Sequence, residues 1–264
     1  MIRLGFVLDV CRQIEGHLQS LQGLVNDVKD IGRAVLCSNR RIPFTAYNHA
    51  FRVNVAESEA DRLIADVVGY YEPMGLKPCF MVSPSTCPST FTDYLRKSGF
   101  ELALEEDDMV FKGSHEGFVS NSEVRVAVDD GSLTNVCTDV FMKSFGFPMV
   151  FRDAFVSLLK KGGCHEGTRY YIGYFEGNPA GGCALFSFNK VGGIFAVGTI
   201  PEYRRKGIAT ALLQKAIGDS VSMGNTLLYL TTTKGSDAEK LYKSLGFEVA
   251  HTHYRYELHP ETHS

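Results

Sequence analysis

The segment from Ile200 to Leu213 most constrains the fold, because it predicts a strand, a tight basic turn and a helix in immediate succession. Pro201 and the charged residues after it end the strand, and Gly207 lets the backbone approach a ligand closely. Apolar residues at helical spacing then predict a helix with one buried face, formed by Ile208, Leu212, Leu213 and Ile217. The first-turn amides of such a helix lack intrahelical partners, so together with the basic turn they favour a bound anion.

The basic turn contains the pattern Arg204-x-x-Gly207-x-Ala209. This pattern resembles the acetyl-CoA signature Arg/Gln-x-x-Gly-x-Gly/Ala of the GNAT family of N-acetyltransferases. Its surroundings add to the resemblance, since Gly193 to Ile200 resembles the family's fourth strand and Ala238 to Phe247 resembles its last helix and closing Gly-Phe pair. An ordinary strand–turn–helix with a surface Arg/Lys cluster is the alternative, but it does not account for three elements in this order.

Composition indicates a soluble globular protein. The chain has 264 residues, of which 44% are hydrophobic and 22% charged, and this length suits two packed domains. A net charge of −3 gives no reason to expect nucleic acid, and no apolar stretch approaches the roughly 18 residues of a membrane span. The first ten residues break too early for a secretory signal, so we expect a cytoplasmic protein. Seven cysteines without a Cys-x-x-Cys pair predict reduced, mostly buried thiols and no metal site.

The first residues predict a long helix from Gly5 to about Val35, which contains no proline. Its apolar residues recur at alternating steps of four and three: Val7, Cys11, Ile14, Leu18, Leu21, Val25 and Val28. This period is typical of coiled coils and would allow a homodimer through this helix. A helix packed on its own domain explains the same stripe. A loop from Ser38 to Asn48, a strand from Phe51 to Val55 and a helix from Ala60 to Tyr71 are expected next.

The sequence also contains an internal repeat, which we call the internal echo. Gly75 to Val82 leads through a Ser/Pro/Thr loop into Tyr94 to Ala103, just as Gly224 to Leu230 leads into Leu241 to Ala250. Both copies predict strand, loop, short helix, Gly-Phe and strand, which indicates duplication of a unit. The first copy has no basic glycine turn, and alignment of the Gly-Phe pairs places Leu95 opposite Tyr242. The first half therefore resembles the degenerate half of tandem GNAT proteins, and we interpret it as a scaffold.

We predict an α+β fold with a mixed sheet, namely the GNAT acyl-CoA N-acyltransferase fold as two related domains in tandem. A degenerate GNAT-like domain without a cofactor signature would span residues 1–115, and a catalytic GNAT domain residues 116–264, with the boundary in the Gly/Ser-containing segment from Lys112 to Ser122. The second domain would contain helices at Ser132–Phe145 and Phe151–Lys161, one from Gly207, and strands at Glu123–Val128, Thr168–Glu176, Ala180–Asn189, Val191–Ile200, Thr226–Thr233 and Glu248–Leu258.

The resemblance implies acetyl-CoA as cosubstrate. Its diphosphate would be bound by the turn residues Arg204, Arg205, Lys206, Gly207, Ile208, Ala209 and Thr210, chiefly through backbone amides. In the family the fourth strand splays from the fifth, so Val197 and Thr199 would pair with the pantetheine arm and the Val197 N–H would polarise the thioester oxygen. Gly198 fits a bulge or close approach, or only packing. Gly235 replaces an asparagine of many relatives, which puts that cofactor contact in doubt; Ser236 or Asp237 would cap the helix instead.

Tyr242 is the predicted general acid, because many family members carry theirs four residues before the Gly-Phe pair. A phenol of pKa about 10 can protonate a thiolate of pKa roughly 8.5. The alternative is a tyrosine packed under the sheet with its hydroxyl in solvent. No general base stands out: His165, Glu166, His251 and His253 are candidates, but each is more typical of a surface or edge residue.

The resulting functional prediction is an acyl-CoA-dependent N-acetyltransferase in which a primary amine attacks directly through a tetrahedral intermediate. A covalent acyl-enzyme is disfavoured because Cys183 and Cys164 have no recognisable activating partner. A small-molecule amine is the expected acceptor, with a protein N-terminus or lysine as the alternative acceptor. A non-catalytic acyl-CoA sensor or interaction module is the alternative function.

Overall fold

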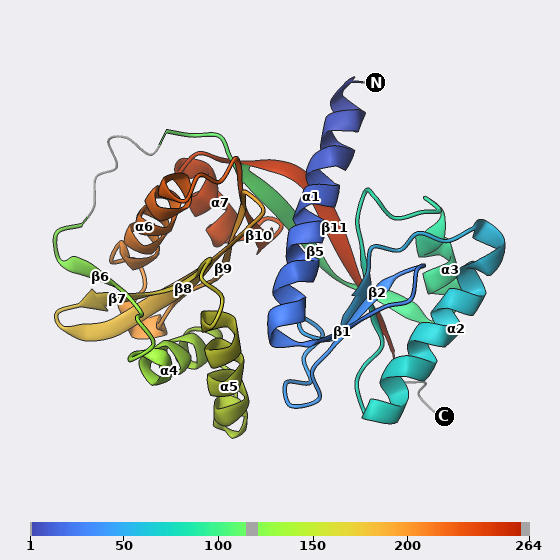
Figure 1. Ribbon diagram of the computed structural model, residues 1–264, viewed down its shortest axis with the longest axis horizontal. Coiled ribbons are helices and arrows are strands. Elements are labelled where there is room, and N and C mark those ends of the chain that lie inside the picture. The colour runs from blue at the N-terminus through green and yellow to red at the C-terminus, as the bar shows by residue number, and fades with distance from the viewer. Residues whose placement is uncertain (1, 115–120, 260–264) are drawn as a thin grey trace. The chain divides into compact units, whose positions relative to one another are not determined.

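The computed structural model describes residues 2–114 and 121–259, and its contacts divide these residues into two units (Figure 1). The first unit contains the described residues up to Asp108, Thr232–Lys234 and the residues from Val249 onward. The second contains the described residues of Met109–Thr231 and of Gly235–Glu248. Together the elements form an α+β structure with a mixed sheet, as predicted from the sequence.

The last strand, β11 (Phe247–Leu258), does not lie wholly in the second unit, as a single domain boundary near residue 115 would require. β11 pairs antiparallel with β4 (Cys79–Val82), with Tyr254 opposite Val82 and Glu257 opposite Cys79. Most of this strand thus belongs to the first unit, although it follows the GNAT-like segment in sequence. Residues 115–120, where the predicted boundary falls, lie outside the described residues.

The first unit has strands ordered β1-β2-β3-β4-β11-β5. Besides β4 and β11 these are β1 (Asp27–Asp30), β2 (Val35–Ser38), β3 (His49–Phe51) and β5 (Phe100–Phe111). Its helices are α1 (Ile2–Val25), α2 (Ala60–Tyr71) and α3 (Phe91–Lys97), with 3-10 turns η1 (Glu57–Glu59) and η2 (Glu72–Met74). Alternate strand residues face opposite layers: Leu36 and Phe80 pack with α2 and α3, whereas Val35 and Met81 pack with Leu18 of α1.

Helix α1 is shorter than predicted, because the chain turns into a hairpin after Val25. Val28 lies in β1 and Val35 in β2, joined through Gly32, whose φ of 75° suits a turn. Within α1, Val10, Cys11 and Ile14 are buried in the first unit. The stripe therefore needs no second chain to explain it, and dimerisation through α1 stays a prediction.

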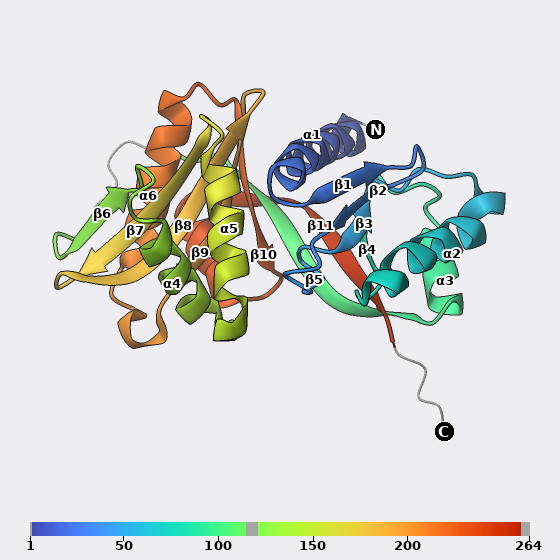
Figure 2. The same ribbon diagram turned by 60° about the horizontal axis from the view of Figure 1, so that its bottom comes forward.

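The second unit has strands ordered β10-β9-β8-β7-β6, and helices cover both faces (Figure 2). The strands are β6 (Val124–Val128), β7 (Thr168–Phe175), β8 (Asn178–Phe188), β9 (Val191–Thr199) and β10 (Leu227–Thr233). The helices are α4 (Thr134–Phe145), α5 (Arg152–Gly163), α6 (Ile208–Ser222) and α7 (Asp237–Ser244), with 3-10 turns η3 (Met149–Phe151) and η4 (Pro201–Tyr203). Tyr171 packs in the cluster of α6, whereas its neighbour Ile172 packs with Leu159 of α5.

Two stretches of the chain, residues 27–111 and 168–258, repeat one order of elements, although the long strand that ends the second stretch lies mostly in the first unit. In the first copy, three antiparallel strands (β1–β3) are followed by the 3-10 turn η1, helix α2, strand β4 parallel to β3, the short helix α3 and the long strand β5. In the second copy the same order is formed by β7–β9, η4, α6, β10 parallel to β9, α7 and β11. The internal echo is therefore longer than the sequence indicated.

Two further features bear on the sequence predictions. All seven cysteines are free, and five of them are buried. Among the described helices, none combines the length and the apolar character that crossing a membrane requires.

Candidate functional site

The turn between β9 and α6 presents a row of backbone N–H groups that are unpaired in the part of the chain that the structure describes. Arg205 (φ 63°) and Gly207 (φ 78°) both adopt the left-handed conformation, and Gly207 caps α6. Left-handed residues alternating with others make concavities of N–H groups that bind anions. Among the described residues the first backbone hydrogen bond after the turn is donated by the Ala211 N–H to the Gly207 carbonyl, at 3.0 Å. Within residues 2–114 and 121–259 no backbone acceptor binds the amides from Arg205 to Thr210, and their role in a diphosphate site stays a prediction.

The basic side chains of the turn are partly engaged by the protein itself. Arg204 Nε donates to the Thr199 carbonyl oxygen at 3.4 Å. Lys206 Nζ lies 4.5 Å from the ring centroid of Phe175 and 5.5 Å from that of Tyr203. Ile208 is buried in the core, and Ala209 and Thr210 are half-buried. The arrangement therefore relies on fixed backbone donors more than on mobile side chains for anion contacts.

Asn121 is a residue of this turn that sequence reasoning missed. Its Nδ2 donates to the Lys206 carbonyl oxygen at 3.1 Å, and its Oδ1 accepts from the Glu123 N–H at 3.0 Å. Its side chain also lies 3.5 Å from where a Cβ on Gly207 would stand. Asn121 thereby fixes the peptide between two residues of the turn. No local signal marks it, because the contact spans 85 residues of sequence.

β9 and β10 separate along their length. Their parallel pairing runs from Val191 opposite Leu227 to Ile194 opposite Leu230, although β9 continues to Thr199. Across β9 from β10, the register with β8 shifts between Gly182 and Ala184, and Ala196 has a positive φ of 55°. β9 is buried up to Ile194 and half-exposed at Val197 and Thr199. The end of β9 is thus bulged and separated from β10, a geometry that allows an extended ligand to pair with it; the predicted contacts of Val197 and Thr199 stay predictions.

Gly198 packs tightly against α4. A Cβ at this position would lie 2.7 Å from Ser144 Cβ and 2.8 Å from a ring carbon of Phe145. The missing side chain thus accommodates helix packing, the plainer of the two interpretations of this glycine. Through this contact the end of α4 lies against Gly198, the residue after Val197 in β9.

Tyr242 lies in α7 and is 5% exposed, with its ring centroid 6.2 Å from that of Phe247. It belongs to the hydrophobic cluster that contains Ile208 and Cys183 and against which Val197 packs, so the predicted acid and the predicted thioester strand share one core. Burial raises the pKa of Tyr242, which makes the phenol a weaker acid than free tyrosine. The ring is buried, as both the acid role and the alternative interpretation require, so the role of Tyr242 stays a prediction.

The start of α7 departs from the family pattern at Gly235, which has a φ of 79°. The Glu239 N–H donates to Ser236 Oγ at 3.2 Å, and the Gly235 N–H donates to Glu239 Oε2. This reciprocal arrangement is a variant of the capping box, so Ser236 caps the helix as expected and Asp237 is its first residue. Gly235 has no side chain to contribute a cofactor contact.

The candidate base His165 lies at the wrong end of the sheet. Its ring centroid is 5.0 Å from that of Phe186, which pairs with Gly193 on β9. Gly193 precedes Val197 by four residues, or roughly 13 Å along the strand. His165 Nδ1 also accepts the Gly167 N–H at 3.0 Å. A direct proton transfer needs hydrogen-bond reach, so neither His165 nor the exposed Glu166 beside it qualifies.

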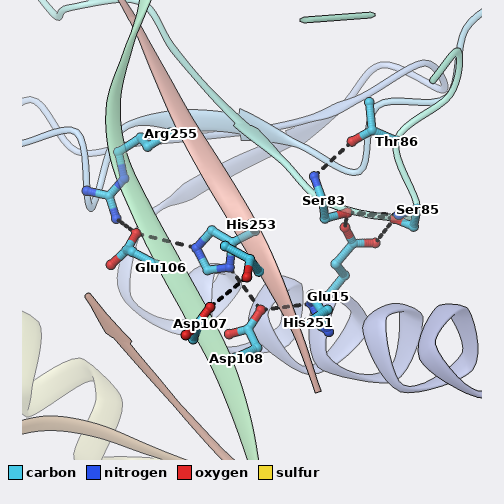
Figure 3. Close-up of polar contacts among 11 residues, drawn as sticks. Glu15, Ser83, Ser85, Thr86, Glu106, Asp107, Asp108, His251, His253 and Arg255 are labelled. Carbon is cyan, nitrogen blue, oxygen red and sulfur yellow. Dashed lines mark hydrogen bonds and ion pairs between the residues drawn. The ribbon is translucent and has the colours of Figure 1, made fainter. Parts of the chain in front are cut away.

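The other two candidates, His251 and His253, are not surface or edge residues. They are 7% and 4% exposed and belong to a buried charge network of the first unit, which consists of Glu106, Asp108, His251, His253 and Arg255 (Figure 3). Asp108 Oδ2 lies 2.9 Å from both His251 Nε2 and His253 Nδ1. Glu106 Oε2 contacts His253 Nε2 at 3.3 Å and Arg255 at 2.5 Å.

The network keeps both imidazoles charged. Burial by itself would lower the pKa of His251, but the hydrogen bond to Asp108 and the adjacent Cys11 thiol raise it to about 9. Burial likewise opposes the charge on His253, yet Asp108 and Glu106 raise its pKa to about 10. Burial would raise the pKa of Asp108, but the charge of His253 and bonds from both rings hold it well below its usual range. These histidines therefore serve as cations and not as bases near neutral pH.

The equivalent position in the first unit differs in charge. Its turn into α2 carries Glu57, Glu59 and Asp61, so the helix N-terminus faces carboxylates instead of a basic turn. Beyond β3, which ends earlier than the predicted strand, the Cys87 N–H donates to Val53 and Cys87 accepts from the Val55 N–H. The strand edge that is open in the second unit is thus paired with the chain itself.

Comparison with known proteins identifies the family that the second half of the chain resembles. Residues 138–247 match the model of the acetyltransferase (GNAT) family. The chain carries a GNAT acetyltransferase domain. The match includes β9, the basic turn, α6 and Tyr242, the elements on which the resemblance was argued. No curated protein matches the chain.

Several solved structures have a fold similar to that of nearly the whole chain, including its first half. A GCN5-related N-acetyltransferase from Kribbella flavida is 15% identical with a TM-score of 0.72, and the alignment covers 93% of this chain and 95% of that one. Another from Sphaerobacter thermophilus is 17% identical with a TM-score of 0.65, over 88% and 83%. A tandem GNAT protein from the clavulanic acid biosynthesis pathway is 11% identical with a TM-score of 0.60, over 90% and 85%. The predicted tandem GNAT fold is confirmed.

Proposed function

We propose that the chain transfers an acetyl group from acetyl-CoA to a primary amine by direct attack. The observation that carries the proposal is the combination of an open, bulged β9 end with a row of unpaired amides at the start of α6. The amides suit a diphosphate, and the β9 backbone from Val197 to Thr199 suits the extended arm behind it. We assign the cofactor contacts to Val197, Thr199 and the turn from Arg204 to Thr210.

The residues divide the chemistry as follows. The acetyl thioester supplies the activated carbonyl, and the β9 backbone at Val197 orients it. The amine nitrogen bonds to the carbonyl carbon to form a tetrahedral intermediate, which then collapses with cleavage of the carbon–sulfur bond. The nitrogen loses one proton to solvent, the sulfur gains one, and the donor to sulfur regains its proton from solvent. Tyr242 is the proposed donor to sulfur. Cys183 takes no covalent part, because burial raises the pKa of its thiol and keeps it protonated.

The test measures CoA release with a panel of primary amines, for the wild type and for Tyr242→Phe. If Tyr242 protonates the leaving thiolate, the phenylalanine variant should lose about 10²-fold in kcat while its KM for acetyl-CoA stays the same. Unchanged turnover in this variant would remove the role of Tyr242 but leave acetyl transfer intact. Failure of the wild type to bind CoA in calorimetry would refute the proposal as a whole.

A second candidate is a non-catalytic acyl-CoA sensor, which the burial of Tyr242 favours because a raised pKa weakens the phenol as an acid. Tight CoA binding without CoA release for any amine would decide for the sensor. A protein N-terminus or lysine is the alternative acceptor. Homodimer formation and a cytoplasmic location stay predictions.

A further inference from the structure

An uncharged, exposed segment follows α4 beside the proposed thioester strand. We call Phe145, Phe147, Met149 and Val150 the apolar ledge. Phe145, Met149 and Val150 are 47%, 61% and 82% exposed, which is unusual for large apolar side chains so close together in sequence. Phe147 is half-buried, with its ring centroid 4.9 Å from that of Phe155 and 6.3 Å from that of Phe145. The ledge is therefore anchored at one side in the aromatic core and open at the other.

The ledge is continuous with β9. Phe145 packs on Gly198, where a Cβ would stand 2.8 Å from its ring, and Gly198 directly follows Val197. The preceding residue, Ser144, is 8% exposed, and its hydroxyl has no hydrogen-bond partner within the described residues. A buried hydroxyl without a partner points to a polar group that the bound state supplies. An apolar surface that ends in one unsatisfied hydroxyl beside the reacting strand fits a ligand that is apolar except for its nitrogen.

The charges around the ledge disfavour a polycation. The nearest charged side chain after the ledge is Arg152, which binds Asp139 through Nε at 2.7 Å and through a second nitrogen at 3.3 Å. Asp139 is thereby engaged, and Lys143 before the ledge is exposed and positive. A polyamine or an aminoglycoside needs several carboxylates to bind its ammonium groups, and besides the paired Asp139 the start of α5 offers only the exposed Asp153. An aromatic ring, by contrast, packs well against phenylalanine edges and methionine.

We propose that the acceptor is a small primary amine carrying an apolar group of ring size. The ring packs on the apolar ledge, the nitrogen reaches β9 near Gly198, and Ser144 Oγ accepts a hydrogen bond from it. This inference rests on the proposed acetyl transfer and specifies its acceptor. It places the specificity of the site in residues that contact no part of the predicted diphosphate turn.

The test compares 2-phenylethylamine with ethanolamine, spermidine and a lysine-containing peptide in the CoA-release assay. The wild type should acetylate 2-phenylethylamine with a kcat/KM about tenfold or more above the others. Met149→Asp combined with Val150→Asp should lower that kcat/KM about tenfold or more and leave the KM for acetyl-CoA unchanged. Val221→Asp, at a residue of α6 that is 42% exposed, is the matched control and should change neither value. Ser144→Ala should raise the KM for the amine several-fold.

Direct binding provides a second readout. Saturation-transfer NMR should detect 2-phenylethylamine on the CoA-saturated wild type and a weaker signal on the double aspartate variant. Preference for a polar amine or the peptide, or an undiminished rate in the double variant, overturns the inference while acetyl transfer stands. CoA binding without acetylation of any amine overturns both, and absence of CoA binding refutes the proposed function at its first step.

Discussion

Replacing Asp108 with asparagine removes one negative charge from the buried charge network and keeps the size of the side chain. In the wild type Asp108 Oδ2 stands 2.9 Å from two imidazole nitrogens, and the three side chains are between 3% and 5% exposed. Removing one partner of a buried ion pair costs about 3–5 kcal/mol, because the other charge stays buried without compensation. The asparagine oxygen can still accept one hydrogen bond, so we expect a loss near the lower end, about 3 kcal/mol at pH 6.

The pH dependence separates this charge effect from a loss of packing. The pKa values of His251 and His253 are raised to about 9 and about 10. Unfolded histidine titrates near about 6.5, so their contribution is fully present below that pH and is lost as the pH rises through the folded values. The pKa of Asp108 is lowered, so its contribution is present above about pH 4 and is lost as the pH falls toward its folded value. In Asp108→Asn the decline in stability from pH 7 to 10 should flatten.

Urea unfolding followed by circular dichroism measures the change, since the chain has no tryptophan to report by fluorescence. Hydrogen exchange of the β11 amides assigns the loss to the first unit. Asp66→Asn is the matched control, because its pair with Arg33 leaves the aspartate 45% exposed and should contribute about 0.5 kcal/mol. A loss under about 1 kcal/mol at pH 6, or an unaltered decline between pH 7 and 10, would refute the stabilising role of these charges.

Three further predictions concern the cofactor turn. Gly207→Asp should weaken CoA binding about 30-fold in calorimetry, because it adds a negative charge where α6 begins. The matched variant Gly207→Asn should bind CoA nearly as the wild type does, since asparagine tolerates the left-handed conformation of this residue. Equal CoA affinities of the two variants would contradict an anion site. Asn121→Ala removes the hydrogen bond to the Lys206 carbonyl and should raise the KM for acetyl-CoA about fivefold in steady-state assays, with kcat unchanged. A lower kcat at an unchanged KM would show that Asn121 acts in the chemical step instead. Calorimetry should give one CoA per chain, since Glu57, Glu59 and Asp61 oppose an anion at α2, and a stoichiometry of two would show that the first unit also binds.

Local signals predicted several elements of both units well. The expected helix from Ala60 to Tyr71 coincides with α2, and β9, the basic turn and α6 follow one another as expected. These elements are specified by residues close in sequence: a stripe of period 3.6, a proline that ends a strand and a glycine that needs a positive φ. The same reasoning gave Ser236 or Asp237 as the helix cap, and Ser236 is the one observed, in a capping pattern that is complete within four residues.

Contacts between residues far apart in the sequence could not be predicted from such local patterns. Val28 extended the apolar stripe of α1 by coincidence, since it lies in β1 and packs against the sheet cluster that contains Val35. The pairing of β11 with β4 joins residues far apart in the chain, and no periodicity specifies which strand a neighbour will be. One signal was available for the buried charge network: Glu106 and Asp108 alternate on one strand as His251, His253 and Arg255 do on another, which is the pattern of charged residues facing each other across a sheet.

The two units show that scaffold and site are separable. Both place a 3-10 turn and a helix after a third strand, so both supply helix N-terminal amides at the same point of the fold. What differs is the charge around those amides, three basic residues in one unit and three acidic residues in the other. It also matters whether the neighbouring strand edge is open, as at β9, or paired with Cys87 as after β3. The backbone therefore permits an anion site in either unit, and a few side chains and one loop favour the second unit, to which we assign acetyl-CoA binding.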